Sequence, residues 1–251
     1  MPVRKNILIT GASSGIGREM AKQYAHMGRN LALCARRTEN LIELKQEIDN
    51  INSDITVAIR TLDVNEHEQV FKVFNELCHE LGHLDRVIIN AGVGKGAPLG
   101  VGKFFANKNT ATTNFVSAIA QSEAALEIFR AQNYGHLVAV SSLTAVCGFG
   151  KAASVYAASK AALSSLSEGL RIDLLNTPIK VTTIHPGYIR SEMTGNDKVM
   201  PFIVDTNVGV RAIVKASEKE GASYFVPTWP WALIARILPL LPLPLLAKLV
   251  N

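Results

Sequence analysis

The sequence predicts one α/β domain built on a doubly wound, mostly parallel sheet of about seven strands flanked by helices. Short β-branched or apolar runs alternate with longer stretches that carry apolar residues at helical spacing. Strands that read as near-continuous apolar runs are typical of a parallel sheet covered on both faces. No linker, repeat or low-complexity segment divides the 251 residues. We expect residues 1–228 to form this domain and residues 229–251 to form an apolar extension.

Seven segments have the character of strands, and helical patterns such as LIELKQEI (41–48) and VFKVFNEL (70–77) lie between them. The predicted strands are residues 6–10, 31–35, 55–60, 86–91, 135–142, 179–186 and 223–227. In such sheets, ligands bind outside the carboxyl ends of the strands. The loops that follow the strands are therefore expected to carry the chemistry.

Charge and cysteine content exclude several classes of protein. The formal charge is +5, but the basic residues are scattered, with no cluster longer than Arg36-Arg37, so we expect a solvated surface and no nucleic-acid partner. Three cysteines without CxxC spacing indicate reduced thiols. Cys78, His79 and His83 point in different directions on one helix, so we expect no metal. The N-terminus lacks a signal-peptide pattern, which predicts a cytoplasmic location.

The loop after the first strand, TGASSGIG (residues 10–17), has three glycines and runs into a helix. Glycine lets the backbone approach a pyrophosphate, and the helix N-terminus offers free N–H groups to it. Tight turns also need glycine, but the position after the first strand favours phosphate binding. The expected cofactor contacts here are Gly11, Ser13, Ser14, Gly15, Ile16 and Gly17.

The end of the second strand predicts the form of the cofactor. A site for NAD usually has a carboxylate there, whereas this chain has Arg36 and Arg37, with its first acid at Glu39. Guanidinium groups attract a 2′-phosphate, and Ser13 adds a hydroxyl donor. This pattern favours NADP(H) over NAD(H), against the alternative that both arginines only solvate a loop.

The third and fourth strands end in weaker signals. Asp63 and Val64 are placed to cover the edge of an adenine. Asn90, Ala91 and Gly92 are small enough for the chain to pass beneath a ribose.

In SVYAASKAAL (154–163), Tyr156 and Lys160 lie four positions apart and so share a helix face. The spacing alone fits either a catalytic acid with its tuning cation or two polar side chains on an ordinary helix.

Seven motifs in order decide between these alternatives: TGASSGIG, LDV, NAG, TTNFV, VAVSS, YAASK and HPGYIRSEM. From about Lys5 to Pro227 the chain resembles the short-chain dehydrogenase/reductase family, in its single-domain branch with a Rossmann-like fold. The resemblance implies that Tyr156 is the general acid and that Ser142 hydrogen-bonds the substrate oxygen. It also implies that Lys160 binds the nicotinamide ribose and lowers the tyrosine pKa from about 10, and that Asn114 holds a water.

The same resemblance places Pro186, Gly187, Ile189 and Ser191 against the nicotinamide. Ser142 lies one residue further from Tyr156 than is usual in the family, so Ser141 is a second candidate for its role. We expect His185, just before the Pro-Gly turn, to be structural rather than a general base.

The tail is apolar from residue 237 to 247, with Arg236 and Lys248 at its ends. Eleven residues interrupted by prolines cannot cross a bilayer as a helix, which needs about 20. Two hypotheses stay open: residues 229–251 contact a membrane surface and admit a lipophilic substrate, or they cover the active site or a subunit interface.

The sequence thus predicts an NADP(H)-dependent oxidoreductase that acts on the carbonyl or alcohol of an apolar substrate. The alternatives are a non-catalytic NADP-binding regulator and, less well matched because the chain is short, a sugar-nucleotide epimerase. Resemblance further implies a homodimer or homotetramer, paired through helices around residues 107–133 and 153–176.

Overall fold

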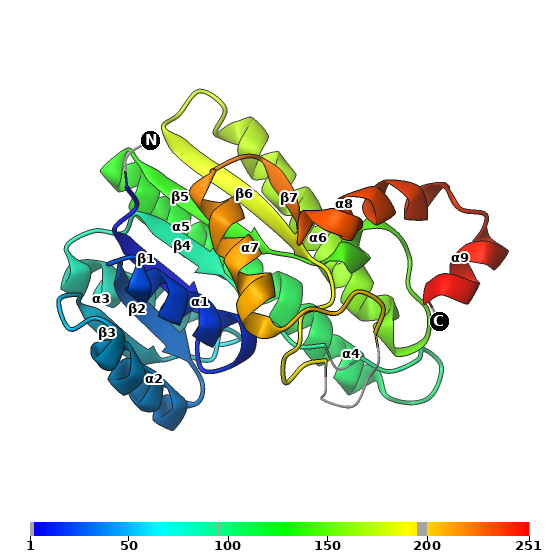
Figure 1. Ribbon diagram of the computed structural model, residues 1–251, viewed down its shortest axis with the longest axis horizontal. Coiled ribbons are helices and arrows are strands. Elements are labelled where there is room, and N and C mark those ends of the chain that lie inside the picture. Colours follow the sequence, from blue (N-terminus) through cyan, green and yellow to red (C-terminus); the bar gives the residue numbers. More distant parts are fainter. Residues whose placement is uncertain (1–2, 95, 195–199, 251) are drawn as a thin grey trace.

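Seven parallel strands form one sheet at the centre of the molecule (Figure 1). The structure is a computed structural model that describes residues 3–94, 96–194 and 200–250. The strand order is β3-β2-β1-β4-β5-β6-β7 and every pairing is parallel, so the predicted doubly wound sheet is confirmed. The strands are β1 (Asn6–Thr10), β2 (Asn30–Ala35), β3 (Val57–Thr61), β4 (Arg86–Ile89), β5 (Gly135–Val140), β6 (Ile179–Pro186) and β7 (Ser223–Val226).

Helices cover both faces of this sheet (Figure 1). One face packs against α1 (Gly15–His26), α2 (Thr38–Ile51) and α7 (Thr206–Glu218). The other face packs against α3 (His67–Leu81), α5 (Ser117–Gln132) and α6 (Ser154–Asp173). A short helix, α4 (Phe104–Ala111), precedes α5 and contacts α6.

β1 illustrates why the strands read as continuous apolar runs. Successive side chains of a strand point to opposite faces. Ile7 and Ile9 join the core beneath α1, α2 and α7, while Leu8 joins the core beneath α3, α5 and α6. All three are fully buried. A strand covered on both sides therefore needs apolar residues at every position.

β4 and β5 each end two residues earlier than the sequence predicts, and β7 ends one residue earlier. β4 stops at Ile89 because Asn90 turns toward β1, where its backbone N–H and its side-chain amide donate to the Thr10 hydroxyl and carbonyl. β5 stops at Val140, although Ser141 still donates to the Ile184 carbonyl at 2.8 Å. The polar residues that follow both strands consequently lie in loops at the carboxyl edge of the sheet.

The tail folds back onto the carboxyl edge and then leaves the body of the molecule (Figure 1). It consists of α8 (Thr228–Ile237), a 3-10 turn (Leu238–Leu240) and α9 (Leu243–Val250). Trp231 and Ala235 on α8 pack against Leu143, which follows β5. In residues 3–94, 96–194 and 200–250, none of the helices has the length and apolar character needed to span a bilayer.

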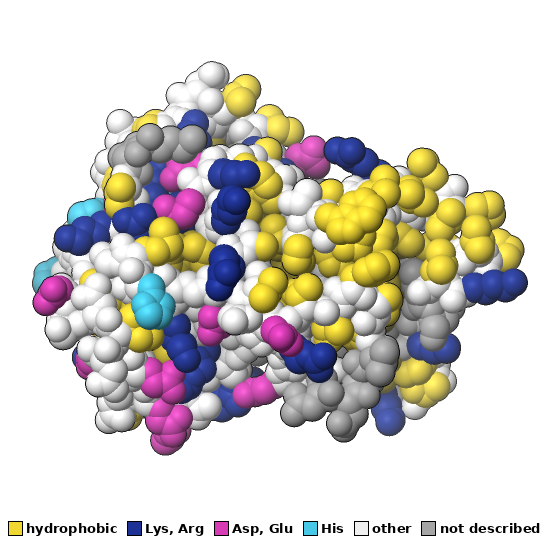
Figure 2. Space-filling view, in the orientation of Figure 1, with side chains coloured by type: hydrophobic (Ala, Val, Ile, Leu, Met, Phe, Trp, Pro, Cys, Tyr) yellow, Lys and Arg dark blue, Asp and Glu magenta, His cyan; other side chains and the backbone are white. Residues whose placement is uncertain are grey.

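The outward side of the tail is apolar as well. Figure 2 shows hydrophobic side chains gathered over α8 and α9. The exposed ones are Trp229, Leu233, Ile237, Leu240, Leu243, Leu245 and Leu249.

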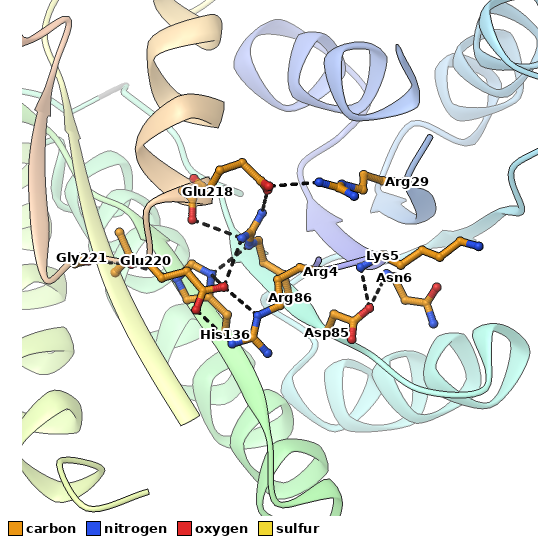
Figure 3. A network of polar contacts seen from close by, with 12 residues as sticks. Arg4, Lys5, Asn6, Arg29, Asp85, Arg86, His136, Glu218, Glu220 and Gly221 are labelled. Atoms are coloured by element: carbon orange, nitrogen blue, oxygen red, sulfur yellow. Dashed lines mark hydrogen bonds and ion pairs between the residues drawn. The ribbon is translucent and has the colours of Figure 1, made fainter. Parts of the chain in front are cut away.

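A network of charged side chains lies at the amino edge of the sheet, opposite these loops (Figure 3). Arg86 begins β4 and is only 1% exposed; its Nε donates to Nδ1 of His136 at 2.8 Å, and its Nη1 pairs with Glu218. Glu220 accepts from Nε of Arg4 at 2.7 Å. Burial holds the pKa of His136 well below its usual value, so this histidine is a neutral acceptor for Arg86.

Candidate functional site

The glycine turn is packed so closely that side chains would not fit at two of its positions. Gly11 has φ +66°, and a Cβ placed on it would lie 2.9 Å from Cα of Ala91. A Cβ on Gly17 would lie 2.4 Å from the carbonyl oxygen of Gly11. The amide of Asn90 donates to the Thr10 carbonyl at 2.9 Å. The side chain of Asn90 therefore holds the turn against the end of β4, as a cradle for phosphate requires.

Arg37 lies over the serines of this turn. Its Nε is 3.4 Å from Oγ of Ser13, and its Nη2 donates to Oγ of Ser14. The sequence predicts a cation and hydroxyl donors here, and the structure brings them into one group. Ser14 is the N-cap residue of α1, has an extended backbone and leaves its hydroxyl unused as a cap.

Arg36 points toward the end of β3 instead. Its Nη1 lies 3.9 Å from Oδ2 of Asp63, and both side chains are at least one-third exposed. Oδ1 of Asp63 accepts from the backbone N–H of Asn65 at 3.0 Å. Val64 is 7% exposed, so its side chain belongs to the core rather than to an open binding surface. The two neighbouring arginines thus have different surroundings.

Tyr156 and Lys160 lie on the first turns of α6, beside the loop that follows β5. Ser142 caps the 3-10 turn Leu143–Val146 by accepting from the Thr144 N–H at 3.2 Å, and its side chain lies close enough to Tyr156 to lower the pKa of that hydroxyl. The neighbouring hydroxyl of Ser141 donates to the carbonyl oxygen of Lys160 at 2.9 Å, so it faces the helix. Ser142 is therefore the serine that the fold presents to Tyr156.

Burial governs the protonation of the Tyr156–Lys160 pair. Lys160 is 5% exposed, and burial lowers the pKa of its ammonium group to about 8. Burial raises the pKa of Tyr156, an effect that the nearby Ser142 side chain partly offsets. The sequence predicts that Lys160 lowers the pKa of Tyr156. In the structure, Nζ of Lys160 donates to the Val140 carbonyl at 2.8 Å, and burial determines the direction of the Tyr156 shift. Tyr156 is thus a protonated hydroxyl at neutral pH, able to donate a proton.

Asn114 lies in a five-residue π-helix, Thr112–Val116, between α4 and α5. Such irregular turns are frequent at functional sites. Its amide brackets Val93, accepting from the backbone N–H at 2.8 Å and donating to the carbonyl at 2.9 Å. A Cβ on Gly92 would lie 3.1 Å from Oδ1 of Asn114 and 3.5 Å from Nζ of Lys160. Gly92 therefore leaves both polar groups open to the same space, and the water expected between them stays a prediction.

The loop after β6 completes the site. Ser191 lies against the glycine turn, with its Cβ 3.5 Å from where a Cβ on Gly15 would be. Ile189 is 2% exposed and packs in the core beneath α7, so only its backbone can meet a cofactor. Pro186 ends β6, next to the Gly187 turn. His185 is buried, donates from Nδ1 to the Ser142 carbonyl at 3.2 Å and stacks on Phe225, as a structural residue would.

Three aromatic residues pack together near this loop, and two of them, Tyr188 and Trp231, were not predicted as parts of the site. Trp231 is 3% exposed, and a Cβ on Gly187 would lie 2.2 Å from its Nε1. Its ring packs edge-on against Tyr188 and Phe202, at centroid distances of 5.3 and 5.9 Å. Sequence patterns could identify an aromatic residue in the tail but not the glycine that receives it. Of the two hypotheses for the tail, the packing of Trp231 favours a cover over the site.

The part of the chain that the structure describes contains no group of three or more His, Cys, Asp or Glu side chains that could hold a metal ion. The donors at the carboxyl edge are hydroxyls, an ammonium, guanidinium groups and backbone N–H groups. These are groups that bind phosphate and ribose.

Comparisons with known proteins agree with this geometry. Residues 5–200 match the short chain dehydrogenase family. An uncharacterized oxidoreductase of Mycobacterium tuberculosis is 52% identical over 239 residues, which cover 95% of this chain and 94% of the relative. An uncharacterized oxidoreductase of Myxococcus xanthus is 36% identical over 96% of this chain and 94% of its own. The fold matches that of levodione reductase with a TM-score of 0.82 and 22% identity, over 91% of this chain and 98% of the other. The chain is therefore an oxidoreductase that belongs to the short-chain dehydrogenase/reductase family.

Proposed function

We propose that this protein transfers hydride between NADP(H) and the carbonyl or alcohol carbon of an apolar substrate. The observation that carries the proposal is the arrangement of Tyr156, Ser142 and Lys160 beside the glycine turn. The protonated hydroxyl of Tyr156 lies beside the side chain of Ser142, and the buried ammonium of Lys160 lies one helical turn away.

In the direction of reduction, Tyr156 donates its proton to the substrate oxygen. Ser142 donates a hydrogen bond to the same oxygen and stabilises the negative charge that develops there. Bound nicotinamide supplies the hydride. Lys160 faces the space beside Gly92 together with Asn114 and would hold the ribose hydroxyls.

Arg37, Ser13 and Ser14 support NADP(H) as the cofactor. A 2′-phosphate needs hydrogen-bond donors and positive charge, which a guanidinium flanked by two hydroxyls provides. Asp63, which follows β3, faces Arg36, the neighbour of Arg37 in the chain. The other expected contacts fit a cofactor that lies along the carboxyl edge of the sheet. They are Gly11, Gly15, Ile16, Gly17, Ala91, Gly92, Pro186 and Gly187.

The aromatic group of Tyr188, Phe202 and Trp231 supports an apolar substrate. It adjoins Leu143 and Val146, the first and last residues of the 3-10 turn that follows Ser142. A carbonyl oxygen held by Ser142 and Tyr156 would place the rest of its molecule near this apolar wall. Aliphatic, aromatic and steroid carbonyls are the classes to test.

The decisive experiment measures oxidation of NADPH and of NADH by the purified protein against graded carbonyls. Tyr156→Phe should lower kcat by at least about 100-fold, because the proton donor is lost. Ser141→Ala, next to the serine that faces Tyr156, serves as the control and should stay within a fewfold of wild type. NADPH binding without turnover of any carbonyl would favour the regulator instead, and turnover with NADH alone would overturn the reading of Arg37.

The outward leucines of α8 and α9 support a second part of the proposal, peripheral contact with a membrane. Arg236 and Lys248 lie among them, and residues 228–250 contain no acidic side chain. Leu240 and Leu243 are 82% and 76% exposed. Replacing both with Asp should abolish sedimentation with anionic liposomes. Leu175→Asp, at an equally exposed site far along the chain, is the matched control. Unchanged sedimentation of the double variant would overturn this part alone.

Assembly into a homodimer or homotetramer through the faces of α4, α5 and α6 also belongs to the proposal. Exposed apolar side chains support it: Phe105 on α4, Ile119 on α5, and Val116 in the π-helix between them. Sedimentation velocity of the full-length protein would measure the assembly state.

A further inference from the structure

The guanidinium of Arg37 is shared between two kinds of partner. On one side it contacts the hydroxyls of Ser13 and Ser14. On the other, its Nη1 and Nη2 each lie 3.2 Å from Oε2 of Glu192. The donors that a 2′-phosphate would need are thus already engaged by a carboxylate.

This ion pair joins two loops that are more than 150 positions apart in the chain. Arg37 follows β2, whereas Glu192 follows β6 and is next to Ser191, which lies against Gly15. The pair therefore crosses the glycine turn, from the end of β2, where the adenosine of a cofactor is expected, to the loop after β6. Arg190, another cation of this loop, pairs with Asp205 at 3.2 Å.

The pair is also free to open. The side chains of Arg37 and Glu192 are 48% and 65% exposed. Exposed ion pairs are weak, and a side chain with this much freedom can leave without a change in the backbone. A phosphate with close to two negative charges would compete with one carboxylate for the same guanidinium, and the carboxylate would repel it.

We propose that Glu192 is a specificity-determining residue that competes with the cofactor's 2′-phosphate for Arg37. The inference rests on the proposed use of NADP(H). Glu192 weakens the binding of NADPH while leaving NADH almost unaffected, because NADH presents no group to Arg37 that the carboxylate opposes. The residue thereby limits the preference for NADP(H) that Arg37 creates. Its removal should tighten NADPH binding roughly three- to fivefold, as expected for one exposed ion pair.

Direct binding tests this without using activity. The full-length protein is titrated by calorimetry with adenosine 2′,5′-bisphosphate and with 5′-AMP, which differ only in the 2′-phosphate, and then with NADPH and NADH. Glu192→Gln should tighten the bisphosphate and NADPH by that factor and leave 5′-AMP and NADH unchanged. Glu43→Gln is the matched control, because Glu43 is an exposed carboxylate on α2 in the same part of the molecule. It should change none of the four affinities.

A second comparison asks whether Glu192 acts through Arg37. In an Arg37→Met background, Glu192→Gln should no longer tighten the binding of the bisphosphate.

An equal gain in affinity in both backgrounds, or a gain shared by 5′-AMP, would overturn the proposal. Unchanged bisphosphate binding in Glu192→Gln, with wild type still preferring bisphosphate to 5′-AMP, would overturn it and leave the NADP(H) assignment intact. If neither protein prefers the bisphosphate, both fail. A preference that arises only in Glu192→Gln would support the role of Glu192 while overturning the NADP(H) assignment.

Discussion

At the scale of single residues, the site depends on a charged side chain that is almost completely shielded from water. Lys160 is buried at 5% exposure with a carbonyl partner, Val140, and its pKa is about 8 rather than near 10.5. A buried ammonium is costly unless it is paired, and a single neutral carbonyl compensates only part of that cost. Lys160 is thus a position at which function and stability oppose each other.

The opposition has a measurable dependence on pH. Between pH 8 and 10.5 the unfolded chain holds a proton on Lys160 that the folded protein has released, so folding stability attributable to this residue rises with pH. Wild type should therefore gain stability relative to Lys160→Met over this range, by up to about 3 kcal/mol. Urea unfolding of both proteins at pH 7.5, 9 and 10 measures the difference. A gap that stays constant would show that Lys160 titrates at its usual pKa.

Ser142 and Ser141 allow a second test at this scale, because neighbours in sequence face different partners. Ser142 contacts Tyr156, whereas Ser141 binds the Lys160 carbonyl and Oγ of Ser164, the latter at 2.7 Å. Ser142→Ala should lower kcat by roughly 100-fold with little change in melting temperature. Ser141→Ala should do the reverse, lowering stability by about 1 kcal/mol and kcat only slightly. Steady-state kinetics and thermal melts on both variants decide which serine acts.

At the scale of elements, the tail helix α8 is fixed by one close contact. Trp231 occupies the space that a side chain at position 187 would need, and it lies edge-on to Tyr188. Trp229, two residues earlier, is 76% exposed. The same short helix thus presents one tryptophan to the site and another to the surroundings.

Gly187→Ala should displace α8, because the new methyl group would overlap the indole of Trp231. In a Trp229→Phe background, Trp231 is the one tryptophan left in the chain. Its fluorescence should shift to longer wavelength when Gly187 is replaced, as the ring enters water. Gly148→Ala, where an added Cβ would meet no atom within 4 Å, is the control. An unshifted spectrum would mean that the body accommodates the methyl group without releasing the helix.

The elements also show how far sequence patterns reach. Apolar runs located all seven strands, and the bounds of β1 and β6 agree with the prediction because both stay buried to their ends. The polar groups after β2, β4 and β5 were predicted because each follows its strand directly. Trp231 and Glu192 were not predicted as neighbours of Gly187 and Arg37, since their positions depend on loops that meet only in three dimensions.

At the scale of the whole molecule, stability and chemistry occupy opposite edges of the sheet. The amino edge holds the network of Arg86, His136, Glu218 and Glu220, which links β4, β5 and the end of α7 (Figure 3). The carboxyl edge holds Tyr156 and the glycine turn. Changes at one edge should therefore leave the properties of the other almost unaltered.

Arg86→Leu should lower the free energy of unfolding by roughly 3–5 kcal/mol, because buried carboxylate and imidazole partners lose their cation. The affinity for NADPH should stay within twofold of wild type. Arg60→Leu, which removes a partly exposed arginine paired with Glu76 and Glu80, should cost about 1 kcal/mol or less. Urea unfolding and cofactor titration of both variants provide the comparison. Loss of NADPH binding by folded Arg86→Leu protein would contradict the separation of the two edges.

The attachment of the tail also has a practical meaning for redesign. Because α8 and the turn after it are anchored through Trp231, Ala235 and Leu238, while the residues expected to hold the dinucleotide all lie earlier in the chain, we expect the tail to be exchangeable as a unit. A tail taken from another protein could be attached here if it keeps a tryptophan opposite Gly187. Such an exchange would alter the range of substrates while leaving the cofactor preference unchanged.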